Sequence, residues 1–301
     1  MTHVDLGGTT VDRIVELDPH WIDPFYLFKN IDQPTLDRCA DWLGPMLWSP
    51  QLNRLAISYH SFLIRAGGRN ILVDACNGND KDRFGMPWTH RFKYTRYLSD
   101  LARHGLTPDD IDVVTCTHLH CDHVGWNTRL EDGRWVPTFP NARYVFSREE
   151  FEHHRRRFDA WPVDGGPYGY GSFQDSVLPV VEAGLADFVA NDHVLRRELD
   201  EHVRLEPAPG HTPGHVFVSV KGREGAALIT GDAIYHPIQL REPWIAGVGD
   251  FDEETAVRTR RAMLDRLSDG DEIALTCHFP DPNACRIRRD GDRYGFDFIY
   301  P

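Results

Sequence analysis

The chain has 301 residues, of which 41% are hydrophobic and 26% charged, as in a globular, water-soluble protein. This length allows one large domain or two small ones around a sizeable core. The net charge of −13 disfavours nucleic acid as a partner. No apolar run approaches the ~20 residues of a membrane span, and the first residues lack the basic and apolar blocks of a signal peptide. We therefore expect a cytoplasmic protein with no membrane partner.

Residues 1–54 are rich in aromatic side chains, among them Trp21, Tyr26 and Trp42, which disfavours a disordered tail. The segment also contains Pro19, Pro24, Pro34, Pro45 and Pro50. These prolines argue against long regular elements. We expect an ordered arm that packs on the core or on the partner of a homodimer. An alternative role for its aromatic side chains is to wall an apolar substrate pocket.

Two apolar runs, Leu55–Ala66 and Asn70–Ala75, are separated by Gly67 and Gly68, which predicts a β-hairpin. Residues 76–79 then form a loop that we expect near the functional site. Helical spacing over 92–104 ends at Gly105, which predicts a helix there.

The most informative stretch follows the apolar run 111–116, which predicts a short buried strand. Residues 117–125 read T-H-L-H-C-D-H-V-G. Side chains alternate in an extended segment, so His118 and His120 point the same way and can bind one metal ion. Asp122 and His123 lie past the turn and can face a second ion. Imidazole and carboxylate ligands suit zinc and its neighbours. The alternative, a solvated polar loop, explains a lone histidine better than this cluster.

Turn and cap residues predict the elements that follow residue 128. We expect a hairpin over 129–140, a strand over 141–146, and helices that begin at Ser147, Ser172 and Asp252. Between them, residues 158–172 are rich in glycine and aromatic residues, including Trp161. This loop is either a lid over the site or surface packing.

The H-x-H-x-D-H stretch resembles the signature of the metallo-β-lactamase superfamily. Three further positions match the ligands of that family: His211 within 209–215, Asp232 after the strand 226–230, and His278 after the strand 273–277. The resemblance covers roughly residues 55–295, so we assign 55–301 to the catalytic domain. It implies an α/β fold, the αβ/βα four-layer sandwich, in which two mixed β-sheets carry helices on their outer faces and the metals lie at one edge.

The resemblance also implies a chemistry. His118, His120 and His211 would bind one divalent metal ion, and Asp122, His123 and His278 a second, with Asp232 bridging the two. Zinc is the first expectation, and manganese, iron and cobalt accept the same ligands. A hydroxide between the ions would attack the carbonyl of a small-molecule lactone or related neutral ester. Asp122 would also transfer a proton.

Three residues near the ligand positions have predicted roles of their own. His215, four residues after His211, is expected to orient the loop by hydrogen bonding rather than to bind metal. Tyr235 lies three residues after Asp232. In quorum-quenching lactonases of the superfamily, a tyrosine at this offset donates a hydrogen bond to the substrate. The alternative is an unrelated loop tyrosine. Trp126 replaces a glycine that is common in the superfamily, and it is expected to shape the pocket together with Trp161.

Within the superfamily, the segments 125–127 and 277–282 are most similar to the group of lactonases and organophosphate (methyl parathion) hydrolases. Alternatives on the same metal site are a phosphotriester or aryl ester hydrolase, a β-lactamase, and a glyoxalase-type thioester hydrolase. A catalytically silent metal-binding scaffold is the alternative that is not an enzyme.

Overall fold

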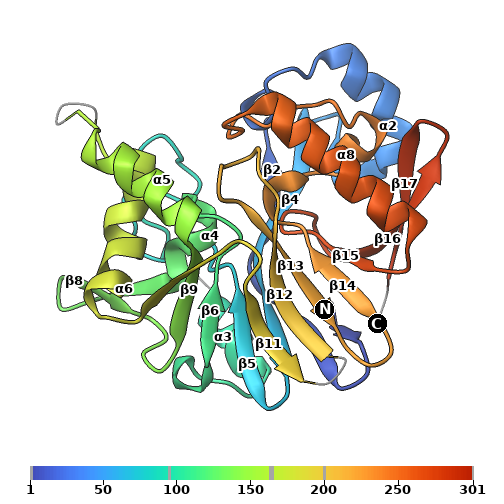
Figure 1. The fold of residues 1–301 in the computed structure, drawn as a ribbon. Coiled ribbons are helices and arrows are strands. Elements are labelled where there is room, and N and C mark those ends of the chain that lie inside the picture. The colour runs from blue at the N-terminus through green and yellow to red at the C-terminus, as the bar shows by residue number, and fades with distance from the viewer. Residues whose placement is uncertain (1–2, 94–95, 163–165, 199–200, 300–301) are drawn as a thin grey trace.

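A computed structural model describes residues 3–93, 96–162, 166–198 and 201–299 of the protein. Two mixed β-sheets stand side by side in the centre of the molecule, and helices lie on their outer sides (Figure 1). The four-layer α/β sandwich predicted from the sequence is therefore confirmed.

The first sheet has the strand order β1-β2-β4-β5-β6-β9-β10, with β3 paired to β4. Its strands are β1 (His3–Asp5), β2 (Thr9–Ile22), β3 (Trp48–Ser49), β4 (Arg54–Ala66), β5 (Arg69–Val73), β6 (Val113–Thr115), β9 (Arg143–Ser147) and β10 (Ala186–Val189). β5, β6, β9 and β10 run parallel to one another, whereas β4 and β5 form the predicted antiparallel hairpin.

The second sheet follows the chain order from β11 to β17. Its strands are β11 (Val194–Glu198), β12 (Glu201–Pro207), β13 (Val216–Lys221), β14 (Ala226–Ile229), β15 (Ile273–Leu275), β16 (Ala284–Asp290) and β17 (Arg293–Phe298). Only β14 and β15 pair in parallel. A separate hairpin, also predicted, consists of β7 (Thr128–Glu131) and β8 (Arg134–Pro137).

The α-helices are α1 (Pro24–Leu27), α2 (Gln33–Leu47), α3 (Tyr97–Arg103), α4 (Cys121–Val124), α5 (Arg148–Asp159), α6 (Leu178–Glu182), α7 (Ile238–Arg241) and α8 (Glu253–Asp269). Shorter 3₁₀ or π turns are η1 (Pro108–Asp110), η2 (Gly125–Asn127), η3 (Tyr168–Gly171), η4 (Phe173–Val177) and η5 (Gly231–Ala233). Within the described part of the chain, no helix combines the length and apolar character that a bilayer crossing requires.

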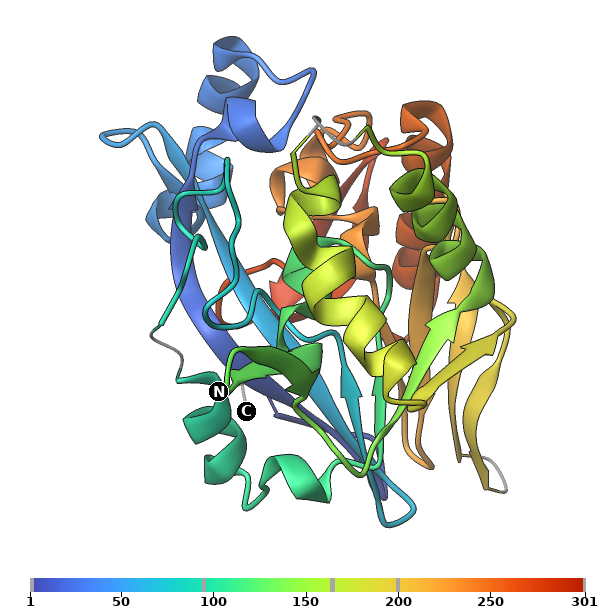
Figure 2. The same cartoon turned by 90° about the vertical axis from the view of Figure 1, so that its left-hand side faces the viewer.

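Apolar side chains hold the layers together. Between the sheets, Phe62 and Ile71 of the first sheet share a buried cluster with Val218 and Ile229 of the second. A separate cluster lies under the helices that cover the outer face of the first sheet, which is the face turned to the viewer in Figure 2. A third cluster packs α8 on the second sheet through Met263 and its neighbours. Each sheet is thus covered on both faces.

The expectation that prolines keep residues 1–54 free of long regular elements is wrong. β2 extends over 14 residues and pairs with β4 along its length, and α2 runs from Gln33 to a kink at Gly44 (φ 64°), directly before Pro45, and then continues to Leu47. Pro19 lies in β2 where its register with β4 shifts, and Pro34 lies in the first turn of α2, where a missing N–H costs no helix bond. Residues 1–54 supply the strands β1, β2 and β3 of the first sheet. The domain boundary predicted at residue 54 stays a proposal.

Two helices differ from their predicted extents. Of the helix expected over 92–104, residues 94 and 95 lie outside the described part of the chain. The helix α3 begins at Tyr97, and the carbonyl oxygen of Phe92 accepts a hydrogen bond from Asp80 N (2.8 Å). The helix expected from Ser172 begins as the π turn η4 and continues as α6, whose first turn contains Pro179. The helices predicted after Ser147 and Asp252 are confirmed, and both residues cap them by accepting a backbone N–H.

Arg260 of α8 tests how α8 stabilises the fold. Its fully buried guanidinium donates to the carbonyl oxygens of Ala233 (2.6 Å), Pro243 (2.9 Å) and Ile245 (2.6 Å). Arg260→Met should leave the buried carbonyl oxygens of Ala233 and Pro243 without their guanidinium donor, each costing about 1–3 kcal/mol, whereas that of Ile245 still accepts from Nε2 of Gln239 (2.9 Å). We expect urea denaturation to show a loss of at least ~2 kcal/mol in the free energy of unfolding. Arg258→Met, on the exposed face of the same helix, should change it by less than about 0.5 kcal/mol.

Candidate metal centre

The predicted ligands lie on four loops at strand ends. His118, His120, Asp122 and His123 follow β6, and His211 lies on the loop between β12 and β13. Asp232 lies in η5 directly after β14, and His278 follows β15. Because β14 and β15 are parallel neighbours, their carboxyl ends meet at one sheet edge and bring Asp232 and His278 together.

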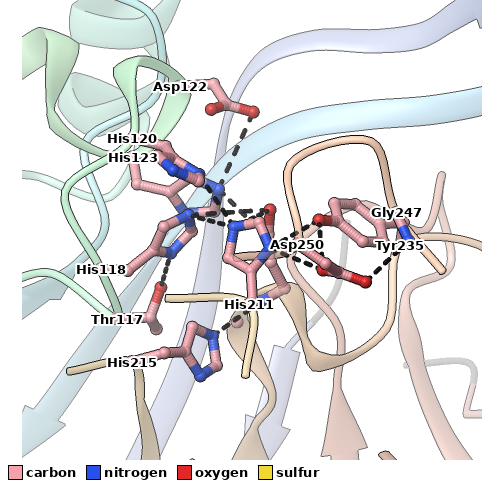
Figure 3. Close-up of polar contacts among 12 residues, drawn as sticks. Thr117, His118, His120, Asp122, His123, His211, His215, Tyr235, Gly247 and Asp250 are labelled. Atoms are coloured by element: carbon pink, nitrogen blue, oxygen red, sulfur yellow. Dashed lines mark hydrogen bonds and ion pairs between the residues drawn. The ribbon is translucent and has the colours of Figure 1, made fainter. Parts of the chain in front are cut away.

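Three imidazoles form a first group of ligand atoms. Nε2 of His211 lies 3.0 Å from Nε2 of His118 and 2.8 Å from Nδ1 of His120. Oδ2 of Asp232 lies 3.8 Å from Nε2 of His118 and 3.5 Å from Nε2 of His211. Donors around a tetrahedral zinc ion stand about 3.3 Å apart, given zinc–nitrogen bonds of ~2.05 Å. The first group therefore has the spacing of a metal site, and its imidazoles converge in Figure 3.

A second group lies on the other side of Asp232. Oδ1 of Asp232 lies 3.1 Å from Nε2 of both His123 and His278. Oδ2 of Asp122 lies 3.8 Å from Nε2 of His123 and 3.7 Å from Nε2 of His278. Asp232 therefore presents one carboxylate oxygen to each group. The structure brings all seven predicted ligands together.

In His123 and His278, the ring nitrogen that faces away from the ligand group donates a hydrogen bond, and this determines whether the other ring nitrogen can bind a metal ion. Nδ1–H of His278 donates to the carbonyl oxygen of Ser58 (3.0 Å), and Nδ1–H of His123 donates to Asp74 (2.9 Å). In the neutral form their Nε2 atoms then carry lone pairs that face Oδ1 of Asp232. That oxygen is buried and has no hydrogen-bond partner among the residues that the structure describes. Lone pairs facing a carboxylate fit a bound cation.

The pKa shifts of the ligand histidines also fit a bound cation. Burial lowers the pKa of His118 and His120 well below that of a free imidazole, and neighbouring histidines lower it further. Both are thus neutral, as a metal ligand must be. Burial also lowers the pKa of His123 and His278, but the Asp232 and Asp122 carboxylates outweigh it and raise both. The second group therefore carries negative charge that a proton or a metal ion can balance.

Two carboxylates that sequence reasoning did not assign hold the ligands from outside. Asp74, at the end of β5, accepts from His123 and from the backbone N–H (2.7 Å) and hydroxyl of Thr117. Asp250 accepts from Nδ1–H of His211 (3.0 Å) and from the backbone N–H of Gly247 (2.7 Å), as Figure 3 shows. Asp74 had a sequence clue, since an acidic residue ending a strand beside the metal loop is a natural partner for its histidines. Asp250 had none.

The loop after β5 supports the metal loop directly, as expected. Gly125 N donates to the carbonyl of Cys76 (2.7 Å), and Ala75 N donates to that of His123 (2.7 Å). The two backbones are so close that a Cβ on Gly125 would lie 1.9 Å from the carbonyl oxygen of Asn77. Glycine is required at position 125 for this contact.

His215 lies outside the ligand groups. Its Nδ1–H donates to the carbonyl of Ala208 (2.9 Å), and its Nε2 accepts from the backbone N–H of Asp232 (3.0 Å). Burial lowers the pKa of His215 to about 4, so the ring is neutral near pH 7. The imidazole therefore fixes the backbone of Asp232 between the two groups.

Tyr235 reaches the site, but its hydroxyl bonds to protein groups. It lies 2.7 Å from Nδ1 of His211 and 3.4 Å from Oδ1 of Asp250 (Figure 3). Its ring packs against Gly247, where a Cβ would come within 2.5 Å of it. Tyr235 thus belongs both to the cavity lining and to the contacts that hold His211.

A cavity of about 770 Å³ opens over the ligands and touches His120, Asp122, His211 and Asp232. Its apolar walls come from both segments that the sequence suggested as pocket walls, namely residues 1–54 and the 158–172 loop. They supply Ile22, Tyr26, Leu27, Trp161, Tyr168 and Tyr170. Trp161 thus lies on the cavity wall, and its role in shaping a substrate pocket stays a prediction.

Trp126 does not lie on this cavity. It is 3% exposed, stacks on Tyr97 at 5.2 Å between ring centroids, and donates from Nε1 to the buried Glu16 carboxylate (2.8 Å). Glu16 also accepts from the backbone N–H groups of Asn77 and Gly78. The indole thus turns toward this buried acceptor and into the core, and the expectation that Trp126 shapes the pocket is not met.

The chain resembles known proteins in both sequence and fold. The sequence profile of the metallo-beta-lactamase superfamily matches residues 56–278. The chain belongs to this superfamily. Within this superfamily fold, the ligand atoms of the two groups lie close enough together to hold metal ions.

Among curated proteins, those similar to the chain include N-acyl homoserine lactonases. It is 24% identical over 196 residues to the N-acyl homoserine lactonase AiiA of Bacillus thuringiensis subsp. kurstaki, covering 64% of this chain and 66% of AiiA. It is 28% identical over 184 residues to the N-acyl homoserine lactonase AttM of Azorhizobium caulinodans, covering 59% of this chain and 61% of AttM. Each alignment thus spans just under two thirds of the lactonase.

Among solved structures, the hydrolase AbOPH of the beta-lactamase superfamily superposes with a TM-score of 0.82 at 21% identity, covering 99% of this chain and 97% of AbOPH. The dizinc quorum-quenching lactonase AidC, solved with a product, gives a TM-score of 0.75 at 18% identity, with coverage of 99% and 97%. At these identities the likeness establishes the fold.

Asp232→Asn should abolish stabilisation of the protein by divalent metal, because the amide loses the negative charge and one acceptor oxygen. A ligand at about 100 times its Kd stabilises the native state by ~2.7 kcal/mol. We expect calorimetry to show a higher Tm for the wild type in Zn²⁺ than in EDTA, and no such shift for the variant. Asp187→Asn, at an exposed pair with Arg143, should keep the wild-type shift. A normal shift in Asp232→Asn would contradict the assignment.

Proposed function

We propose that this protein is a metal-dependent hydrolase that uses two divalent metal ions to open a lactone or a related neutral ester. The observation that carries the proposal is the Asp232 carboxylate, which presents one oxygen to each of two groups of imidazole nitrogens. Membership of the superfamily supports it, as do the curated relatives named as N-acyl homoserine lactonases.

His118, His120 and His211 would hold one ion and Asp122, His123 and His278 the other, with Asp232 shared. Zinc is proposed first, with manganese, iron and cobalt as alternatives. Bound there, the ions would lower the pKa of water toward about 7 and polarise the ester carbonyl.

Asp122 is proposed to move the proton. Its carboxylate belongs to the second group, but 18% of the side chain is exposed and it lines the cavity. It is therefore the ligand carboxylate with most access to substrate, since Asp232 is 4% exposed. A carboxylate in this position can take the proton of attacking water and pass it to the leaving alkoxide.

Tyr235 has two candidate roles. Its hydroxyl lines the cavity and could donate to the oxyanion that forms at the substrate carbonyl. Its contacts with His211 and Asp250 instead favour a role in holding a ligand in place. The two roles differ in whether metal affinity depends on the hydroxyl.

Tyr235→Phe separates these roles. As an oxyanion donor, the hydroxyl should contribute about 10²–10³-fold to kcat, and the variant should keep the metal content of the wild type. Elemental analysis of the purified variant, together with steady-state kinetics, provides the measurement. Reduced metal content at equal turnover per bound metal would assign Tyr235 to holding His211. Unchanged turnover and metal content would exclude both roles.

The cavity favours substrates with an apolar substituent. Tyr59 and Trp88 lie on its wall beside Tyr26, and the Trp88 ring meets that of Tyr26 edge-on at 4.9 Å. Aromatic walls of this kind accept alkyl chains and flat aryl groups. An aryl ester or a phosphotriester is therefore the second candidate substrate.

A matched panel tests the substrate class: acyl-homoserine lactones, aryl lactones, a paraoxon-type triester, a thioester and a cephalosporin, each assayed with Zn²⁺ and with EDTA. We expect the highest kcat/KM with a lactone, and loss of that activity in EDTA. Turnover of the triester or the cephalosporin alone would replace the lactone proposal with that activity. Metal binding without turnover of any substrate would indicate the catalytically silent scaffold.

A further inference from the structure

A buried carboxylate that the metal groups do not use lies directly behind them. Glu150, in the first turn of α5, is 1% exposed. Its Oε1 accepts from the backbone N–H of Leu119 (3.1 Å) and from Nε2–H of His154 (3.0 Å). Its Oε2 accepts from the backbone N–H of Gly214 (3.1 Å). Both oxygens are therefore engaged, and none of these partners is a ligand.

The positions of these donors in the chain are informative. Leu119 stands between the ligands His118 and His120, and Gly214 stands three residues after His211. One carboxylate thus joins the two loops that supply the three imidazoles of the first group. The contact is close, since a Cβ on Gly214 would lie 2.2 Å from the backbone nitrogen of Glu150.

Glu150 remains ionised in this position. Burial would raise the pKa of its carboxyl group, but the His154 imidazole and the Leu119 N–H outweigh burial and hold the pKa well below its usual range. Hydrogen bonds to a charged acceptor are about twice as strong as those between neutral groups. The two loops are therefore joined through a strong acceptor in a buried environment.

The second group is held by other atoms. His123 donates to Asp74 and His278 donates to the Ser58 carbonyl. Among the described residues, none of the hydrogen bonds of Glu150 reaches a ligand of the second group. The two groups thus share Asp232 but differ in their outer support.

We infer that Glu150 is a positioning residue that sets the geometry of the first ligand group and leaves the second group independent of it. The inference rests on the proposed function, because it requires that the ligand groups bind metal ions.

The support extends to the cavity wall. His154 donates from Nε2–H to Glu150, so in the neutral ring Nδ1 is an acceptor, and it accepts from the hydroxyl of Tyr168 (3.0 Å). The His154 ring meets that of the ligand His120 edge-on, with centroids 5.9 Å apart. His154 is therefore a positioning group despite being a histidine beside the metal ligands.

Glu150→Gln tests the inference because an amide has one acceptor oxygen and cannot serve both loops. The probe is Co²⁺ alone, titrated into metal-free protein and followed by its visible absorption and by calorimetry. The wild type should bind two equivalents. In the variant, one equivalent should bind as in the wild type and the other about 10–100-fold more weakly, as is typical when a group behind a ligand is changed. Glu149→Gln, an exposed neighbour that pairs with Asn191, should match the wild type.

Single-group backgrounds identify the affected group. In His278→Ala, which keeps the first group, adding Glu150→Gln should weaken Co²⁺ binding about 10–100-fold. In His120→Ala, which keeps the second group, the same change should have no effect. Equal weakening in both backgrounds, or none in either, would overturn the inference.

Glu150→Asp, too short to span both loops, should repeat the result. Loss of cooperative unfolding in both Glu150 variants would assign the residue to overall stability and also overturn it. Failure of the wild type to bind Co²⁺ would instead refute the proposed function.

Discussion

The site depends on one electrostatic constraint, the convergence of five imidazoles and two carboxylates around a buried point. Their inward atoms carry lone pairs or negative charge, and most of these side chains are buried at the floor of the cavity, where charge is weakly screened. Positive charge at its centre stabilises such a cluster. Asp232 concentrates this requirement, because each of its two oxygens faces a different group. The four loops, their strand ends and their outer partners all serve to keep these donors at ligand spacing.

The outer partners follow a common rule. In His118, His123, His211 and His278, the ring nitrogen that faces away from the ligand group forms a hydrogen bond with a carboxylate, a carbonyl or a hydroxyl group. This bond fixes the tautomer and the direction of the ring. Asp74, Asp250 and Glu150 are buried carboxylates that act from behind the site. They come from three different elements, so each ties a ligand loop to a separate part of the fold.

The sequence predicted the elements whose chemistry is local. The Gly67–Gly68 hairpin, the caps Ser147 and Asp252 and the ligand loop after β6 depend on neighbouring residues, and all were found. The prolines of the first 54 residues misled, because a proline is compatible with a sheet irregularity or a first helical turn. Whether it occupies such a position depends on the partner strand or on the cap, and a proline count contains neither.

The sequence by itself determined which donors exist, their order and the superfamily, because ligand identity and spacing along the chain are properties of the chain alone. Only the tertiary structure decided where the other side chains turn. Trp126 bonds to Glu16 across 110 positions, Glu150 to Gly214 across 64 and Asp250 to His211 across 39. Contacts at such separations arise when sheets and helices pack, and no local pattern records them. The cavity wall, the role of Tyr235 and the support of the ligands therefore emerge only from the folded chain.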